Sequence, residues 1–189
     1  MITDTTCSST YLPKYEDAFS MRYGLFIHWV GPCNGRPGGI CKVDGTSIIT
    51  DIDSYADTYN ISRIVKDISD LGFEYVVVTD FHGKGTLLHP SDVSKKYRGA
   101  EYATTERDVM GEFIQGLYEA GIGSILFTHP LDGHDYHDRE SLGWNDPSNG
   151  YGKWNDFVND MHEELVHKYG KYIMGIGCDS EFGLSNNEE

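Results

Sequence analysis

Basic residues are scarce in this chain, and their scarcity limits its possible partners. The 189 residues include 15 Lys and Arg against 30 Asp and Glu, a formal net charge of -15. A chain this acidic repels the phosphates of nucleic acids, so we expect no nucleic-acid partner. It is equally unsuited to the anionic surface of a membrane. A neutral ligand is indifferent to this charge.

Long apolar runs are also missing. No stretch approaches the roughly 20 consecutive apolar residues that a membrane-spanning helix needs, so we expect no membrane partner. Residues 1–10 are polar and contain no apolar signal-peptide core. Together these features predict a soluble, cytoplasmic protein, unless a leader has been removed.

Cysteine is scarce, and its spacing carries no metal signature. The 4 cysteines form no C-x-x-C pair and fit no zinc framework. Cys33 and Cys41 could bridge in an oxidising compartment, but free thiols are the better interpretation. The cysteines therefore give no reason to expect a structural metal.

What the sequence does contain is an alternation of strand-like and helix-like segments. Short apolar or β-branched runs predict strands. These strands cover residues 24–29, 73–79, 124–128 and 172–178. Stripes with i, i+3, i+4, i+7 spacing predict helices, the first capped by Asn60 and the second preceded by a capping-box-like segment, residues 105–108. These helices cover residues 61–71, 109–117 and 154–169. The alternation is typical of a parallel sheet with right-handed crossovers.

The connections differ in length on the two sides of this sheet. Loops after strands are long, as at residues 31–53 and 80–106, whereas turns after helices are short. This asymmetry is typical of a (β/α) barrel whose loops build a site on one face. A closed barrel has eight strands and about 250 residues, whereas this chain supplies about four βα units. We therefore expect an α/β fold, a partial or half TIM-like barrel over residues 21–189, after a polar lead-in at residues 1–20. Because half a barrel has open edges, we also expect a homo-oligomer or a longer chain.

Polar side chains follow each predicted strand. They are His28 with Trp29, Asp80 with His82, Thr128 with His129, and Asp179 with Glu181. In a barrel the carboxyl ends of the strands converge on one pocket. Imidazoles and carboxylates hydrogen-bond hydroxyl groups, and the ring of Trp29 can stack on the face of a sugar. Without a phosphate loop, the set indicates a neutral polyhydroxylated ligand.

A second cluster favours a different chemistry. Residues 129–138 contain three His and three Asp, which could bind a divalent metal in a metal-dependent hydrolase. The spacing fits no standard motif, so this stays an alternative. His162 and His167 are spaced by five residues, off the i, i+4 pattern, and are predicted to lie on the surface.

Residues 22–29, 75–91, 107–112 and 176–182 form four segments that resemble, in the same order, motifs of the family 29 α-L-fucosidases. Residues 22–29 resemble the signature R-F-G-(I or L)-F-I-H-W-G, and residues 75–91 are similar to Y-V-V-L-T-A-K-H-H-D-G-F-C-L-W-P-S. Residues 107–112 match R-D-V-V-G-E, and residues 176–182 line up with I-W-S-D-G-E-W. The set covers about residues 20–183. Each motif alone is weak, but the set is fairly specific.

The resemblance implies a retaining exo-glycosidase that removes terminal α-L-fucose from a fucosylated glycan or glycoside, with no metal or cofactor. By position, Asp179 would be the nucleophile, and His28 and His82 would hydrogen-bond fucose hydroxyls. Asp57 falls where the family has a Glu-Trp pair that touches the sugar. The family's tyrosine after the third strand falls on Phe127 or Thr128, depending on the gap.

The chain also departs from the family pattern. Gly83 replaces the second histidine of the His-His pair, Thr58 replaces the tryptophan after the acidic position, and Gly177 replaces the tryptophan before the nucleophile. The family's general acid/base would lie beyond residue 189, and losing that proton transfer costs about 10²–10⁴-fold in rate. Glu181 is a weaker candidate partner, because two carboxylates on one strand flank a bond badly. The alternative is a catalytically inactive sugar-binding or assembly module.

Overall fold

The computed structural model describes ten segments of the chain: residues 20–29, 40–41, 48–49, 52–80, 87–99, 104–130, 133, 139–144, 148 and 150–179. The elements in these segments are, in chain order, β1 (Gly24–Ile27), β2 (Ile40–Cys41), β3 (Ile48–Ile49), α1 (Ile52–Ala56), α2 (Ile61–Asp70), β4 (Tyr75–Thr79), α3 (Asp92–Arg98), α4 (Val109–Glu119), β5 (Gly123–Thr128), α5 (Gly152–Tyr169) and β6 (Gly175–Cys178).

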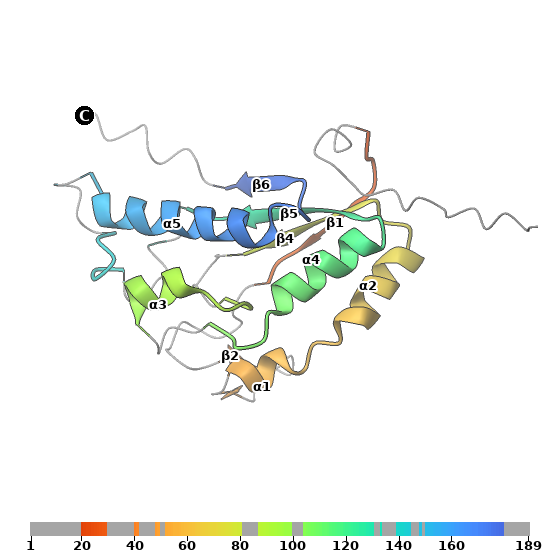
Figure 1. Ribbon diagram of the computed structural model, residues 1–189, viewed down its shortest axis with the longest axis horizontal. Helices are drawn as coiled ribbons and strands as arrows, with labels where there is room; N and C mark the ends of the chain where they lie inside the picture. Colours follow the sequence, from red (N-terminus) through yellow and green to blue (C-terminus); the bar gives the residue numbers. More distant parts are fainter. Residues whose placement is uncertain are drawn as a thin grey trace, which may run out of the picture.

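The centre of the fold is a 4-stranded sheet with the order β1-β4-β5-β6, in which all neighbours run parallel. The strand order follows the chain order, so each crossover packs on the same side of the sheet. Figure 1 shows α2, α4 and α5 together on one side. The predicted α/β class with a parallel sheet is confirmed.

The two faces of the sheet differ in what covers them. On the helix side, Val76 and Val78 of β4 and Leu126 of β5 are fully buried, in one core cluster with Phe113 of α4 and Leu165 of α5. Because successive side chains of a strand point to opposite faces, the alternate residues form the other face.

That second face, here called the open face, carries residues that the strand register places side by side. It consists of Gly24, Phe26, Tyr75, Val77, Thr79, Gly123, Ile125, Phe127, Gly175 and Gly177. Phe26 is 45% exposed, although its ring contacts Phe127 at 5.3 Å between centroids. The described helices therefore leave this apolar face of the sheet partly exposed.

The predicted apolar stripes of two helices are confirmed. All residues of the α4 stripe are buried, namely Val109, Met110, Phe113, Ile114 and Leu117. The same holds for the α5 stripe, which consists of Trp154, Phe157, Val158, Met161, Leu165 and Tyr169. In α2, the predicted stripe of Ile61, Ile64, Val65, Ile68 and Leu71 is wrong at Leu71, which is 67% exposed. Leu71 is the C-cap, one residue after the last helical position. None of the described helices is both long and apolar enough to cross a membrane.

Side chains cap the starts of α2 and α4, and one of the two predicted caps is corrected. Asn60 caps α2 as predicted, because its side chain accepts a hydrogen bond from the Arg63 N–H at 3.1 Å. The capping-box prediction for residues 105–108 is wrong, because it makes Thr105 the N-cap. Asp108 is the N-cap of α4 and accepts from the Gly111 N–H at 2.7 Å, while Thr105 donates to the Arg107 carbonyl at 2.6 Å. A carboxylate at the last position before the helix is the better-placed acceptor.

Helix α3 lies within residues 80–106, which the sequence predicted as a loop. Ser91 caps it by accepting from the Ser94 N–H, and the same hydroxyl donates to Glu164 of α5. Tyr97 packs on Phe157 of α5 at 5.4 Å between centroids. A helix this short has too few apolar residues to show a period, and its contacts with α5 stabilise it.

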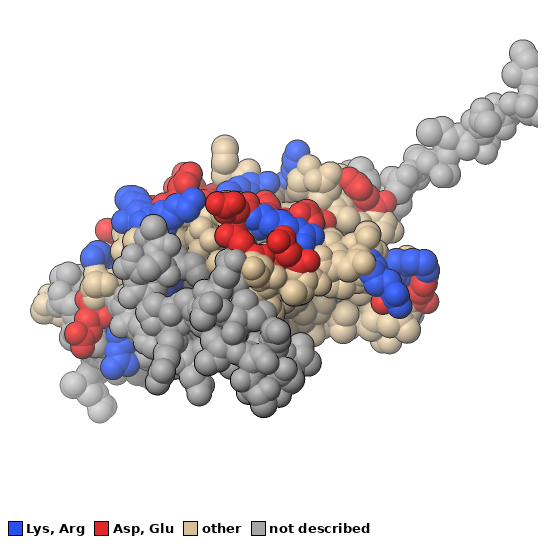
Figure 2. Space-filling view, turned by 90° about the horizontal axis from the view of Figure 1, so that it is seen from below, with Lys and Arg blue, Asp and Glu red and all other residues tan. Residues whose placement is uncertain are grey.

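Acidic and basic side chains are mixed on the surface shown in Figure 2. Ion pairs of the described residues include Lys96 with Asp160 at 2.9 Å and Arg107 with Glu112 at 2.6 Å. Several basic side chains are therefore engaged by neighbouring carboxylates.

Candidate active site

The site is built where β1, β5 and β6 end. Alternation along each strand continues the open face from Phe26 to His28, from Phe127 to His129, and from Gly177 to Asp179. The contacts agree with this alternation. The His28 ring lies 4.5 Å from Phe26 and 6.4 Å from His129, measured between centroids. These side chains, which are far apart in sequence, are neighbours at the carboxyl edge of the sheet.

Asp179 is anchored by its backbone and exposed at its side chain. Its N–H donates to the Thr128 carbonyl at 2.9 Å, so it continues the β5–β6 pairing by one residue. The side chain is 54% exposed, and its Oδ2 lies 3.6 Å from His129 Nδ1. A solvent-accessible carboxylate in a fixed position beside an imidazole is suited to nucleophilic or general-base chemistry.

Gly177 explains how an aromatic ring fits beside Asp179. A Cβ at this position would lie 2.9 Å from Cδ2 of Phe127, closer than real side chains approach. The missing side chain therefore allows the Phe127 ring to lie across β6. Phe127, one of the two positions predicted for the aromatic after the third strand, is on the open face.

Trp29 and Thr128 lie on the opposite face. Trp29 packs on Tyr59 at 5.4 Å and on Phe113 at 5.0 Å, between ring centroids, within the helix-side core. Thr128 is fully buried and shares a hydrogen bond of 2.9 Å with Nε2 of His162. The structure therefore does not bring these two predicted substrate-binding residues together with His28 and Asp179.

The same hydrogen bond corrects the prediction that His162 lies on the surface. His162 is half-buried between α5 and the sheet, whereas His167 is exposed as predicted. Burial lowers the pKa of His162, and the nearby charge of Asp80 offsets this only in part. The helical spacing of the two histidines could not show that one of them faces the end of β5.

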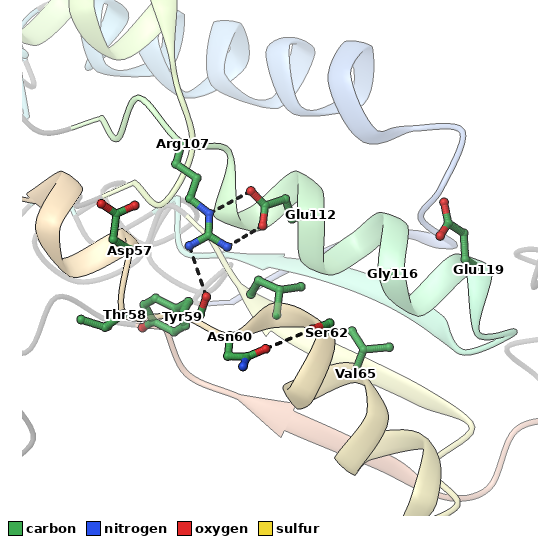
Figure 3. A pocket seen from close by; sticks show the side chains of 11 residues that line it. Asp57, Thr58, Tyr59, Asn60, Ser62, Val65, Arg107, Glu112, Gly116 and Glu119 are labelled. Carbon is green, nitrogen blue, oxygen red and sulfur yellow. Dashed lines mark hydrogen bonds and ion pairs between the residues drawn. The ribbon is translucent and has the colours of Figure 1, made fainter.

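Asp57 lies in a groove on the helix side (Figure 3). The groove has a volume of about 690 Å³ and runs between α2 and α4. Arg107 crosses it with two hydrogen bonds to Glu112, of 2.8 and 2.6 Å, and one to the Ala56 carbonyl of 2.8 Å. The hydrogen bonds from Arg107 lower the pKa of Glu112. Asp57 is thus placed near Arg107, in a groove separate from the residues of the open face.

Asp80, which follows β4, forms a buried pair with His89 that the sequence analysis did not predict. Asp80 Oδ2 is 3.2 Å from His89 Nε2, and the two side chains are 2% and 0% exposed. Burial alone would lower the pKa of His89, but the charge and hydrogen bond of Asp80 outweigh it and raise that pKa. When residues 75–91 are aligned with the second family motif, Asp80 takes the place of the motif's alanine and His89 takes the place of its tryptophan. The two substitutions occur together, and each side chain supplies the other's hydrogen-bond partner.

Several predicted residues lie outside the described part of the chain. They are His82, Gly83, Glu181 and most of the His- and Asp-rich segment 129–138. Within that segment, His129 is described and belongs to the open face. It was predicted both as a strand-end residue and as a possible metal ligand, but not as a partner of Asp179, although alternation from Phe127 places it there.

A comparison with known families identifies the chain. A family model described as Alpha-L-fucosidase matches residues 52–182. The chain belongs to this family. The match confirms the resemblance that the four motifs indicated.

Individual relatives agree with the family match. Alpha-L-fucosidase 1 of Arabidopsis thaliana is 30% identical over 116 residues, which are 59% of this chain and 20% of that protein. An α-L-fucosidase GH29 from Bacteroides thetaiotaomicron has a TM-score of 0.56 at 20% identity, over 92% of this chain and 42% of its own. The Thermotoga maritima α-fucosidase, solved with a mechanism-based inhibitor, has a TM-score of 0.57 at 17% identity, over 90% of this chain and 47% of its own. At such identities the solved structures show a shared fold, and the chain spans less than half the length of these three relatives.

Proposed function

We propose that this chain provides the nucleophile half of a retaining α-L-fucosidase, which removes terminal α-L-fucose from fucosylated glycans or glycosides. The observation that supports this most directly is the placement of Asp179, exposed at the end of β6 beside His129 and on the same face as His28. A retaining glycosidase needs such a carboxylate beneath the sugar ring. The fold shared with solved fucosidases agrees with this site.

In the proposed reaction, a carboxylate oxygen of Asp179 attacks the anomeric carbon of fucose while the bond to the aglycone oxygen breaks. The product of this step is a fucosyl ester of Asp179. Water then attacks the same carbon and gives up a proton to the solvent, the ester bond breaks, and fucose leaves with the carboxylate restored. The aglycone takes up a proton when it leaves, and we assign no donor for it within this chain.

The neighbouring residues of the open face would hold the sugar. The imidazole of His28 can hydrogen-bond fucose hydroxyls, and we propose the same role for His82, which lies outside the described residues. Phe127 and Phe26 present aromatic surface that suits the apolar face of a 6-deoxy sugar. Trp29 and Thr128 would support this site from the helix side.

The test uses a substrate whose leaving group needs little protonation. A nitrophenyl α-L-fucoside releases a stable phenolate, so turnover reports on Asp179 even without a general acid. We expect the wild-type chain to release nitrophenol and Asp179→Ala to fall to the uncatalysed rate, whereas the control variant Asp67→Ala, an exposed α2 residue, keeps the wild-type rate. Equal rates for wild-type and Asp179→Ala would reject the assignment.

A sugar-binding module without turnover is the second candidate, favoured by the loss of the motif tryptophan at Gly177. It predicts that calorimetric titration with fucose shows binding while the aryl fucoside stays intact. Binding that is lost in His28→Ala would then place the ligand on the open face.

We also propose that the open face belongs to a partial barrel whose remaining side is completed by a second copy or by further chain.

A further inference from the structure

We propose that His129 is a positioning residue that orients the Asp179 carboxylate through its Nδ1 atom. This inference rests on the proposed function, because it assigns a task to a neighbour of the proposed nucleophile. The distance from His129 Nδ1 to Asp179 Oδ2 is 3.6 Å, within the range of an ion pair and slightly longer than a hydrogen bond. Such contacts at active sites are often long before substrate binds and tighten in the complex.

The two partners differ in how firmly their surroundings hold them. The side chain of His129 is 6% exposed, against 54% for Asp179. The His129 ring packs edge-on against Phe127 at 5.3 Å and faces His28 at 6.4 Å, between centroids. The imidazole is therefore the more firmly packed member of the pair, and its contact favours one rotamer of the carboxylate.

The backbone fixes the spacing of the pair. Thr128, the residue before His129, accepts the Asp179 N–H at its carbonyl and anchors its own side chain to His162 of α5. His129 and Asp179 therefore start from backbone positions that one residue holds in register. Neither side chain has to cross the site to reach the other.

This arrangement has a chemical consequence. An N–H at Nδ1 that is directed at Oδ2 leaves Oδ1 as the oxygen that forms the bond to the anomeric carbon. No proton is transferred in this role. A misplaced nucleophile lowers the rate of bond formation without a matching loss of substrate binding, because binding depends on other contacts.

The test compares three substitutions that differ in where they place a hydrogen-bond donor. His129→Asn puts an amide nitrogen near the position of Nδ1, His129→Gln puts one near Nε2, and His129→Leu has none. We expect His129→Leu to lower kcat on a nitrophenyl α-L-fucoside by about 10- to 100-fold with KM nearly unchanged. His129→Asn should recover most of the loss, and His129→Gln should not. His167→Leu, at an exposed position of α5, serves as the control and should match wild-type.

A second readout requires no turnover. Long-range ¹H–¹⁵N spectra report which ring nitrogen of His129 carries the proton, and a hydrogen-bond partner determines that choice. We expect Nδ1 to be protonated in the wild-type chain and the distribution to shift toward Nε2–H in Asp179→Ala. Identical His129 nitrogen shifts in the two proteins would overturn the pairing.

The outcomes separate the two proposals. If Asp179→Ala hydrolyses the fucoside at the wild-type rate, the proposed function fails. If Asp179→Ala is inactive but His129→Leu keeps the wild-type kcat, the function stands and the positioning role fails. Equal losses in His129→Asn, His129→Gln and His129→Leu would show that His129 acts by packing alone, which also overturns the inference.

Discussion

The buried pair of Asp80 and His89 offers a sharp test of the packing behind the site. The perturbation is His89→Trp, which introduces the residue of the family motif but leaves Asp80, 2% exposed, without its partner. Removing one partner of a buried pair costs about 3–5 kcal/mol in the free energy of unfolding. Asp80→Ala should cost less, about 1–3 kcal/mol, because His89 can lose its proton and then lacks only one hydrogen bond.

The double variant Asp80→Ala/His89→Trp decides between pairing and simple packing. Replacing a whole buried pair by apolar groups of similar volume is often neutral or stabilising. We therefore expect the double variant to be more stable than His89→Trp alone, in urea titrations that compare midpoints at constant m. If the two single costs simply add, within about 0.5 kcal/mol, the pair is not coupled and the reasoning is refuted.

The pair should also give stability a pH dependence of known sign. The pKa of His89 is raised above its usual value of 6.5, so its contribution to stability is complete below about pH 6.5 and is lost as pH rises through the folded-state pKa. The charge of Lys168 lowers the pKa of His89 and so opposes the effect of Asp80. The lowered pKa of His162 makes a contribution of the opposite sign, because it stabilises the fold more at higher pH. The free energy of unfolding of the wild-type chain, measured relative to that of the double variant, should therefore fall as pH rises above 6.5.

Three further results are expected from other parts of the fold. Asn60→Ala removes the N-cap of α2 and should cost about 1 kcal/mol in urea unfolding; no change would contradict the capping role. Phe113→Ala empties a fully buried position beside Trp29 and should cost about 3–5 kcal/mol, with a change in tryptophan fluorescence; a loss below about 1 kcal/mol would mean that α4 does not pack as described. The exposed Phe26 of the open face predicts self-association of the 21.2 kDa chain by light scattering, weakened in Phe26→Ser; a stable wild-type monomer would contradict it.

Much of the fold follows from periodicity in the sequence. The apolar stripes of α4 and α5 and the β-branched run of β4 are long enough to show their periods, so their type and place could be predicted. Helix α3 could not, because seven residues with two apolar side chains show no period. Its stability depends on contacts with α5, which lies some sixty residues later in the chain.

The site shows a similar division. The sequence places chemistry at strand ends, and alternation puts neighbours such as His28 and Trp29 on opposite faces, but the sequence does not state which of the two faces the helices cover. The position of Asp57 depends on Arg107, which binds the α1–α2 connection from a distant helix start. The coupling of Asp80 with His89 likewise joins residues nine positions apart, which no local pattern reveals.

Covalent trapping tests the central claim most directly, namely that Asp179 is the nucleophile. A fluorinated fucosyl donor with a good leaving group slows hydrolysis of the glycosyl-enzyme, so the adduct can be located by mass spectrometry. Trypsin cleaves after Lys171, and the next fragment, residues 172–189, contains both Asp179 and Glu181. We predict one fluorofucosyl group on this fragment, placed on Asp179 by fragmentation and absent from Asp179→Ala. An adduct on Glu181 or on another fragment, or turnover of the donor without any adduct, would contradict the account.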